Sequence, residues 1–202
     1  MTMAFDAQSE TSDEVLMVLY ANGDRHAALA LTQRVTPRVT AYAARLLSGD
    51  RAEAEDVAQE TLLRLWRIAP EWRQGETKVT TWAYRVATNL CIDRQRSRTR
   101  KRQVALDDAP EVADGSVGAE GRLQEAGRMA ALEAALAELP DRQRQAVVLR
   151  HLEGMTNPEI ATIMEIGVEA VESLTARGKR ALSAILAGRK AELGYEDDRD
   201  AG

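Results

Sequence analysis

A stretch in the middle of the chain constrains the fold most, because it cannot contribute to a hydrophobic core. Residues 103–127 are mainly acidic and small, and they include Pro110 and several glycines. Such a segment buries too little apolar surface to offset the conformational entropy lost on ordering. We therefore predict a flexible linker at 103–127 between two units, residues 1–102 and 128–193, with a disordered tail at 194–202.

Both units have the composition and periodicity of α-helices. Aromatic residues make up 4% of the chain, alanine is abundant and runs of β-branched residues are scarce, which favours helix over strand. Apolar residues recur at three- to four-residue spacing. We expect an all-α fold of two small helical domains, with helices near residues 13–22, 24–47, 51–69, 80–100, 128–138, 142–152, 157–164 and 168–188.

Several classes of function are excluded by what the sequence lacks. The single cysteine, Cys91, permits no intrachain disulfide, and the two histidines have no partner at metal-binding spacing. We see no nucleophile–base pair and no phosphate-cradling glycine loop, so we expect neither an enzyme nor a cofactor. No stretch approaches the ~18 apolar residues of a membrane span, and the first residues do not resemble a signal peptide. We expect a cytoplasmic protein with no membrane insertion.

Net charge alone argues against a nucleic-acid partner, but the distribution of charge reverses that conclusion. The total is -5. Residues 93–102, however, carry six basic groups and one acidic group, whereas residues 103–128 carry two basic and six acidic groups. Six closely spaced cations repel one another, so a polyanion is their natural complement. A solvated basic tail is the alternative.

Residues 156–182 have the pattern of a helix-turn-helix. Thr156 and Glu159 form a capping-box signature, and Gly167 suits the tight turn before the second helix. That helix would lie in a DNA major groove. The residues that it would present are Glu169, Glu172, Ser173, Ala176, Arg177 and Arg180. An ordinary pair of antiparallel helices in a bundle is the alternative.

Aromatic and basic residues interleave just before the basic block. Trp72, Trp82 and Tyr84 lie within 13 residues of one another, beside Arg73, Lys78 and Arg85. Aromatic rings offer stacking faces to unpaired bases, and cations can follow the backbone. Core packing is the competing explanation for Trp82, which lies on the apolar stripe of its helix, while Trp72 falls in a polar loop.

An acidic-polar face marks the helix expected at 51–69. Glu55, Asp56, Gln59 and Glu60 lie opposite its apolar stripe. Taken alone, these four residues indicate only a solvated surface.

Three motifs in this order resemble a known family. The stretches AEDVAQETLLRLW (54–66) and TWAYRVATNLCIDRQR (81–96) resemble the N-terminal domain of bacterial sigma factors, and LPDRQRQAVVLRHLEGMTNPEIATIM (139–164) resembles their C-terminal domain. Because only these two domains are present, the chain resembles the extracytoplasmic-function (ECF) subgroup of the sigma-70 family. The likeness covers about residues 13–187.

The resemblance implies a transcription initiation factor with three contact surfaces. Glu55, Asp56, Gln59 and Glu60 would dock on the clamp helices of the largest subunit of core RNA polymerase, and the C-terminal domain on the flap of the second-largest subunit. The loop at 72–78 would accept a flipped base of the minus-ten element. Residues implied at that element are Trp72, Arg73, Lys78, Trp82, Tyr84, Arg85, Asn89, Arg94, Arg96, Arg98 and Arg100.

The resemblance also assigns the minus-thirty-five element to the C-terminal domain and implies an anti-sigma factor as a further partner. Residues implied at that element are Arg142, Arg144, Thr156, Glu172, Ser173, Arg177, Lys179 and Arg180. Two departures from the family pattern stand out. Glu172 and Leu174 occupy positions that are usually basic, with Glu169 adding another acid, and Gln74 looks like an insertion in the minus-ten loop. A stand-alone helix-turn-helix regulator of duplex DNA is the alternative function.

Overall fold

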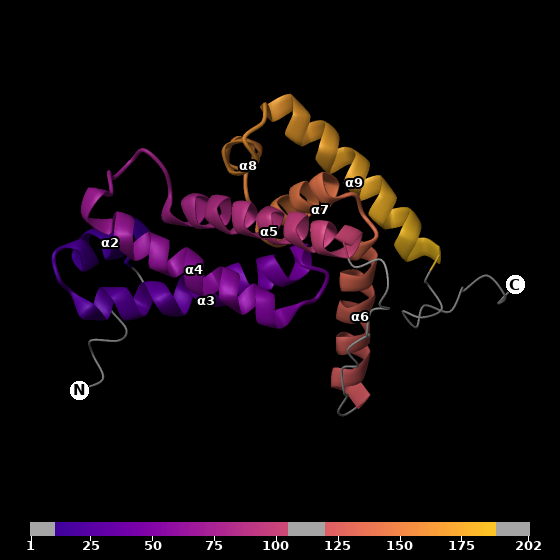
Figure 1. Ribbon diagram of the computed structural model, residues 1–202, viewed down its shortest axis with the longest axis horizontal. Coiled ribbons are helices and arrows are strands. Elements are labelled where there is room, and N and C mark those ends of the chain that lie inside the picture. Colours follow the sequence, from indigo (N-terminus) through magenta and orange to yellow (C-terminus); the bar gives the residue numbers. More distant parts are fainter. Residues whose placement is uncertain (1–10, 105–119, 189–202) are drawn as a thin grey trace, which may run out of the picture.

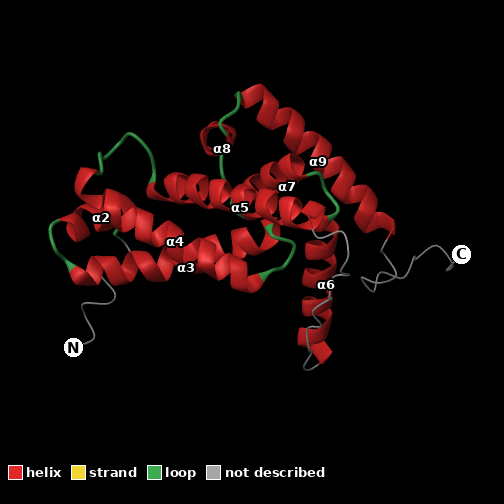
Figure 2. Ribbon diagram, in the orientation of Figure 1, coloured by secondary structure: helices red, strands yellow, loops and turns green. Residues whose placement is uncertain are grey.

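The computed structural model describes residues 11–104 and 120–188. Every regular element within those two ranges is a helix (Figure 2), which confirms the all-α prediction. The central part of the predicted linker, residues 105–119, lies outside the described residues, as does the predicted tail at 194–202. No helix of the described residues is long and apolar enough to span a membrane.

The N-terminal unit is built from α2 (Asp13–Ala21), α3 (Arg25–Leu46), α4 (Arg51–Ile68), the 3₁₀ turn η1 (Ala69–Glu71) and α5 (Val79–Val104). Side-chain caps begin its first three helices, since Ser12, Asp24 and Asp50 each accept a hydrogen bond from a backbone N–H of the first turn. The fully buried core side chains include Leu16, Met17, Leu31, Tyr42, Leu46, Val57 and Leu65.

One buried hydrogen-bond chain ties α3 to α5 inside this core. Thr88 Oγ1 donates to the carbonyl of Tyr84 at 2.7 Å. A hydroxyl has one proton to donate, so the Tyr42 hydroxyl, 2.7 Å from Thr88 Oγ1, is the donor in that contact. Burial raises the pKa of Tyr42 far above its usual range and keeps the proton in place.

The C-terminal unit contains α6 (Glu120–Ala137), α7 (Asp141–Val147) with its π-helical continuation η2 (Val148–Leu152), α8 (Asn157–Met164) and α9 (Val168–Gly188). The predicted capping box is present, with Glu159 accepting from the backbone N–H of Thr156 at 2.8 Å. Leu136, Leu149, Ile160, Ile163 and Val171 form its buried core.

Three local predictions are wrong. Helix α5 continues to Val104 and α6 begins at Glu120, so the ends of the predicted linker are helical. Glycine, which discourages helix by only about 1 kcal/mol, does not prevent α6 from forming through Gly121 and Gly127. The turn before α9 places Glu165 in the left-handed region (φ 54), whereas Gly167 has no such conformation.

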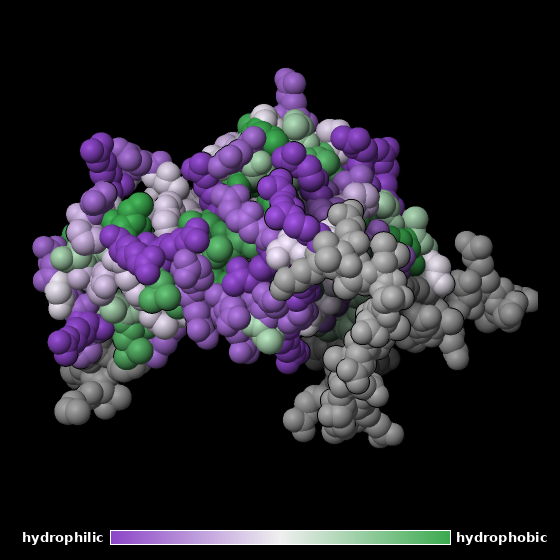
Figure 3. Space-filling view, viewed as in Figure 1, coloured by the Kyte–Doolittle hydropathy of each residue, from purple (hydrophilic) through white to green (hydrophobic). Residues whose placement is uncertain are grey.

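The two units pack against each other. Helix α5 contacts α8, while α3 contacts both α6 and α7. In Figure 1, α5 lies between the α3–α4 pair and the α7–α8 pair, and α9 forms the outer edge of the C-terminal unit. The face in Figure 3 is mostly hydrophilic, with apolar patches scattered over both units. The sequence had indicated separation by a linker, not this packing.

Candidate polymerase and nucleic-acid interfaces

The acidic-polar face of α4 lies at the surface as a single patch. Glu55, Asp56 and Gln59 are exposed, and the neighbouring Leu63 exposes 50% of its surface. Glu60 is half-buried and accepts from Arg64 Nε at 2.8 Å, which lowers the pKa of Glu60. The opposite face packs into the core through Ala54, Val57, Ala58, Thr61, Leu62 and Leu65. Helix α4 therefore offers a partner one apolar side chain and three polar groups that have no ion pair or side-chain hydrogen bond among the described residues.

The loop between η1 and α5 is anchored by an aromatic pair. Trp72 and Trp82 meet edge to face, with ring centroids 6.4 Å apart. Both rings are partly buried. Each therefore packs against the core and still leaves part of its surface open for base stacking. The Trp72 indole Nε1 is buried without a hydrogen-bond partner among the described residues. Beyond this anchor, Arg73, Gln74 and Gly75 are exposed, with Gly75 at φ 88.

Helix α5 divides the basic block between two sides. Arg94 Nε lies 2.6 Å from Glu53 Oε2, and Arg98 pairs with Asp50 at the start of α4. Arg96 and Arg100 are exposed on another side of α5 and form no ion pair within the described part of the chain. Two of the four arginines implied at the minus-ten element are thus already neutralised by α4.

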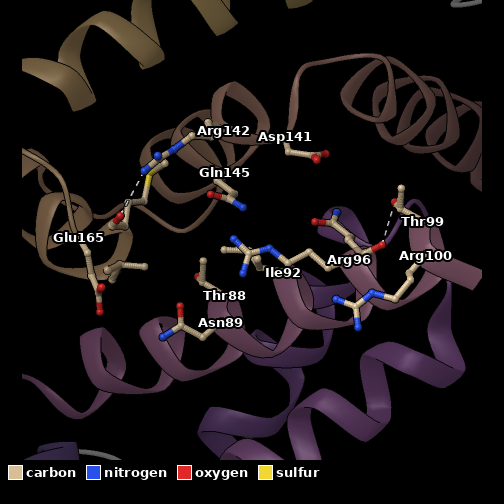
Figure 4. Close-up of a pocket in the computed structure, with 13 residues that line it drawn as sticks. Thr88, Asn89, Ile92, Arg96, Thr99, Arg100, Asp141, Arg142, Gln145 and Glu165 are labelled. Carbon is tan, nitrogen blue, oxygen red and sulfur yellow. Dashed lines mark hydrogen bonds between the residues drawn. The ribbon is translucent and has the colours of Figure 1, made fainter.

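A cleft of about 630 Å³ separates this side of α5 from the C-terminal unit. Asn89, Arg96 and Arg100 line one wall, and Arg142 and Gln145 of α7 line the other. Figure 4 shows these groups on either side of the space, with the dashed line from Arg142 ending on α8. That line is a hydrogen bond of 3.4 Å to the Met164 carbonyl. The lining therefore holds three cations, Arg96, Arg100 and Arg142, together with two acids, Asp141 and Glu165.

Helix α9 separates a packing face from an exposed face. Val171 and Gly178 are buried, whereas Glu172, Ser173, Arg177, Lys179 and Arg180 are exposed. A Cβ at position 178 would lie 2.6 Å from Val147 Cγ2 and 3.1 Å from the Gln143 carbonyl. Gly178 thus permits the close approach of α9 to α7. Sequence reasoning missed this glycine, although a glycine inside a helical pattern is a signal for a close approach.

Three residues implied at the minus-thirty-five element differ in exposure. Arg142 and Thr156 are exposed, but Arg144 is buried between the units. Arg144 donates to the Leu46 carbonyl at 3.2 Å, to Ser48 Oγ at 3.3 Å and to Asp141 Oδ1 at 2.6 Å. A contact from Arg144 to DNA therefore requires the units to separate.

Neither the cysteine nor the acidic and histidine residues of the described chain form a further site. Cys91 is buried in the core of the N-terminal unit, and burial raises the pKa of its thiol to about 12. Among the described residues no cluster of histidine, cysteine, aspartate or glutamate could hold a metal ion.

Comparison with known proteins identifies the family. Residues 31–101 match the family model for sigma-70 region 2, and residues 129–182 match the model for sigma-70 region 4. The ECF RNA polymerase sigma factor SigE of Mycolicibacterium smegmatis is 34% identical over 91% of this chain and 72% of its own length. SigM of Mycobacterium tuberculosis is 30% identical over 91% and 89%, respectively.

Solved structures agree with this assignment. CnrH, determined in complex with the cytosolic domain of CnrY, has a TM-score of 0.64 at 25% identity and covers 88% of this chain and 99% of its own. RpoE of Bartonella quintana, determined with the anti-sigma factor NepR, shares the fold at a TM-score of 0.60 and 22% identity, over 76% and 92%. The chain belongs to the ECF sigma factors of the sigma-70 family. It is a transcription initiation factor that directs RNA polymerase to promoters.

Proposed function

We propose that this sigma factor binds its partners through four surfaces and catalyses no reaction itself. The α4 patch docks on the clamp helices of the polymerase, and the C-terminal unit on the flap. The Trp72–Lys78 loop and α5 bind the minus-ten element, and the exposed face of α9 binds the minus-thirty-five element. It works in the cytoplasm, where RNA polymerase is found.

The geometry of α5 is the observation that carries this proposal. Trp82, Arg85, Asn89, Arg96 and Arg100 follow one another at helical spacing along the helix, next to the Trp72 loop. Aromatic anchors and a line of cations suit a melted strand, in which bases stack and phosphates need neutralising. A regulator of duplex DNA alone would leave both this surface and the α4 patch without a role.

We infer that an acidic residue of α9, Glu172, takes part in recognising the minus-thirty-five element. Glu172 is exposed on the same face as Arg177 and accepts from Asn157 Nδ2 at 3.4 Å. A glutamate can accept from cytosine N4, whereas arginine prefers guanine. We infer that Glu172 and Arg177 together favour a promoter sequence different from that of family members with basic residues at these positions.

An anti-sigma factor is the expected further partner. The CnrH and RpoE structures are complexes with CnrY and NepR, respectively, and RpoE's partner is described as an anti-sigma factor. Because this chain shares their fold and covers nearly all of CnrH, we propose that it is also held inactive by such a protein.

Binding to core polymerase tests the docking assignment. Asp56→Ala combined with Glu60→Ala should weaken binding at least tenfold, because polar groups at the centre of an interface often contribute 1.4 kcal/mol or more, about a factor of ten. Both changes lie at the surface of α4, so the fold should be retained. Glu133→Ala, an exposed acid on α6, is the matched control. Unchanged affinity of the double variant would contradict the α4 assignment.

Promoter-dependent transcription tests the function as a whole. Core polymerase with this protein should give a run-off transcript from a template carrying the upstream region of its own gene. Core polymerase alone should give none. A strong gel shift of duplex DNA by the protein without polymerase, together with no transcript, would favour the stand-alone regulator.

A further inference from the structure

Three glutamates of the C-terminal unit reach across to basic or hydroxyl groups of the N-terminal unit. Glu153 follows η2, Glu159 lies in the first turn of α8, and Glu165 ends α8. Their partners lie on α3, on α5 and in the loop before α5. At three separate places, therefore, a glutamate of the C-terminal unit contacts a basic or hydroxyl group of the N-terminal unit.

Glu153 is the most buried of the three, with 9% of its side chain exposed. One carboxylate oxygen lies 3.1 Å from Arg45 Nη1, and the other accepts from the Tyr84 hydroxyl. Burial and the Glu153 hydrogen bond both raise the pKa of Tyr84 far above its usual range, so Tyr84 remains a donor. Charge-assisted hydrogen bonds of this kind are among the stronger polar contacts in proteins.

Glu165 holds a conformation that a glutamate rarely adopts. Its φ of 54 places it in the left-handed region, where a helix usually ends in glycine or asparagine. Its Oε1 accepts from both Nη2 and Nε of Arg85, at 2.6 and 3.0 Å. Backbone strain of this kind often accompanies function, and here it is combined with a contact between the units.

Glu159 completes the set at the minus-ten loop. Its Oε1 lies 2.8 Å from Lys78 Nζ, while its Oε2 closes the capping box of α8. Lys78, Tyr84 and Arg85 are all residues that we assign to the minus-ten element. Their partners are carboxylates, which have the charge of the phosphates that a bound strand would bring.

We propose that the packed arrangement is a closed state in which Glu153, Glu159 and Glu165 occupy the minus-ten surface in place of DNA. The same packing buries Arg144, which we assign to the minus-thirty-five element. The proposal rests on the proposed function for the identity of the blocked surface. Polymerase, by binding the two units at separate sites, draws the equilibrium toward the open state.

The strength of the contacts suits a reversible closure. The Lys78–Glu159 and Arg85–Glu165 pairs are well exposed on at least one side, so each shifts the equilibrium by no more than a factor of about five. Salt screens such pairs over about 10 Å at 0.1 M. High salt should therefore loosen these two contacts before it loosens the buried Glu153.

A distance measurement tests the closed state without DNA or polymerase. Spin labels at Gln33→Cys on α3 and Ser183→Cys on α9 occupy exposed positions, and the buried Cys91 should resist labelling. The labelled parent should give a single narrow distance distribution at low salt. Adding Glu153→Gln and Glu165→Arg should broaden that distribution. Glu133→Arg, with the same charge reversal at an exposed site on α6, should leave the distance unchanged.

A charge swap separates a broken contact from a damaged fold. Arg85→Glu alone should broaden the distance distribution, and Arg85→Glu with Glu165→Arg should restore the narrow one. A parent that is already broadly distributed at low salt would overturn the proposal, as would a swap that fails to re-close while circular dichroism shows intact helices.

Binding of a single-stranded minus-ten oligonucleotide by the free protein tests the blocking. The Glu153→Gln, Glu165→Arg variant should bind about five to ten times more tightly than the Glu133→Arg control, as two lost ion pairs allow. An open variant with unchanged affinity would overturn the blocking. If polymerase-dependent transcription by the parent is normal, that result leaves the proposed function standing; if transcription is also absent, the proposed function itself has failed.

Discussion

The two surfaces assigned to DNA differ in how their cations are used. On the N-terminal unit, Lys78, Arg85, Arg94 and Arg98 are each paired with a carboxylate. On α9, Arg177, Lys179 and Arg180 are exposed and form no ion pair within the described part of the chain. This difference shows that net charge is a poor measure of how well a surface binds phosphate, because a cation is available to phosphate only when no carboxylate is paired with it.

The largest expected effect is on the free energy of unfolding, and it tests whether α8 and α9 share a hydrophobic core. Ile160 is fully buried, so Ile160→Ala should lower the free energy of unfolding by about 2–5 kcal/mol. Thr162→Ala, at an exposed position of the same helix, should change it by less than about 0.5 kcal/mol. Urea unfolding followed by circular dichroism measures both, and equal effects would contradict the packing of α8.

The next effect tests how α9 is held. Gly178→Ala places a Cβ against the stiff Val147 side chain and the Gln143 carbonyl, and overpacking costs about 1–3 kcal/mol. Gly127→Ala in α6 meets nothing within 4 Å and should gain up to about 1 kcal/mol from helix propensity. Opposite signs in urea unfolding confirm the close approach. A stabilising Gly178→Ala would show that α9 lies farther from α7.

A smaller effect compares an open cation with a paired one. Arg177→Ala should weaken promoter binding by the polymerase complex by about 1 kcal/mol and lower the salt slope by about 0.9. Arg94→Ala should have less than half that effect, because Glu53 already holds Arg94. Filter binding across a salt series gives both numbers. Equal slopes for the two variants would erase the distinction between the surfaces.

The smallest effect is a pH dependence of the contact between the units. Hydrogen bonds from Lys78 and Thr156 lower the pKa of Glu159 from 4.5 to about 2. A lowered folded-state pKa adds stability that is present above pH 4.5 and is lost as pH falls toward 2. Wild type should therefore exceed Glu159→Gln in unfolding free energy by about 1 kcal/mol at pH 6. The gap should close below pH 4.5; a constant gap would show that the carboxylate charge contributes nothing.

The sequence predicted local structure well where a chemical signal marked it. The helices expected near 24–47 and 51–69 are present, and the predicted Thr156–Glu159 box begins α8. It predicted least where contacts join distant residues. The pairing of Glu153 with Arg45 spans 108 positions, and no periodicity marks either residue. The start of α6 at Glu120 was missed because acidic residues and glycine resemble a linker, although tertiary packing can override weak propensity.

For the candidate surfaces too, the sequence predicted local features and missed contacts between distant residues. The α4 patch follows from periodicity alone, since polar residues opposite an apolar stripe must face outward. The burial of Arg144 could not be predicted, because the family resemblance implies a contact with the minus-thirty-five element while its neighbours Leu46 and Ser48 come from the other unit.

The close approach at Gly178 has a consequence for how promoter preference can change over evolution. The face of α9 that holds the helix in place, through Val171 and Gly178, shares no residue with the face that carries Glu172, Ser173 and Arg177. Substitutions on the outer face can therefore accumulate without loosening the helix from α7. A duplicated copy of this gene could acquire a new set of target promoters through a few outward changes while inheriting an unaltered scaffold.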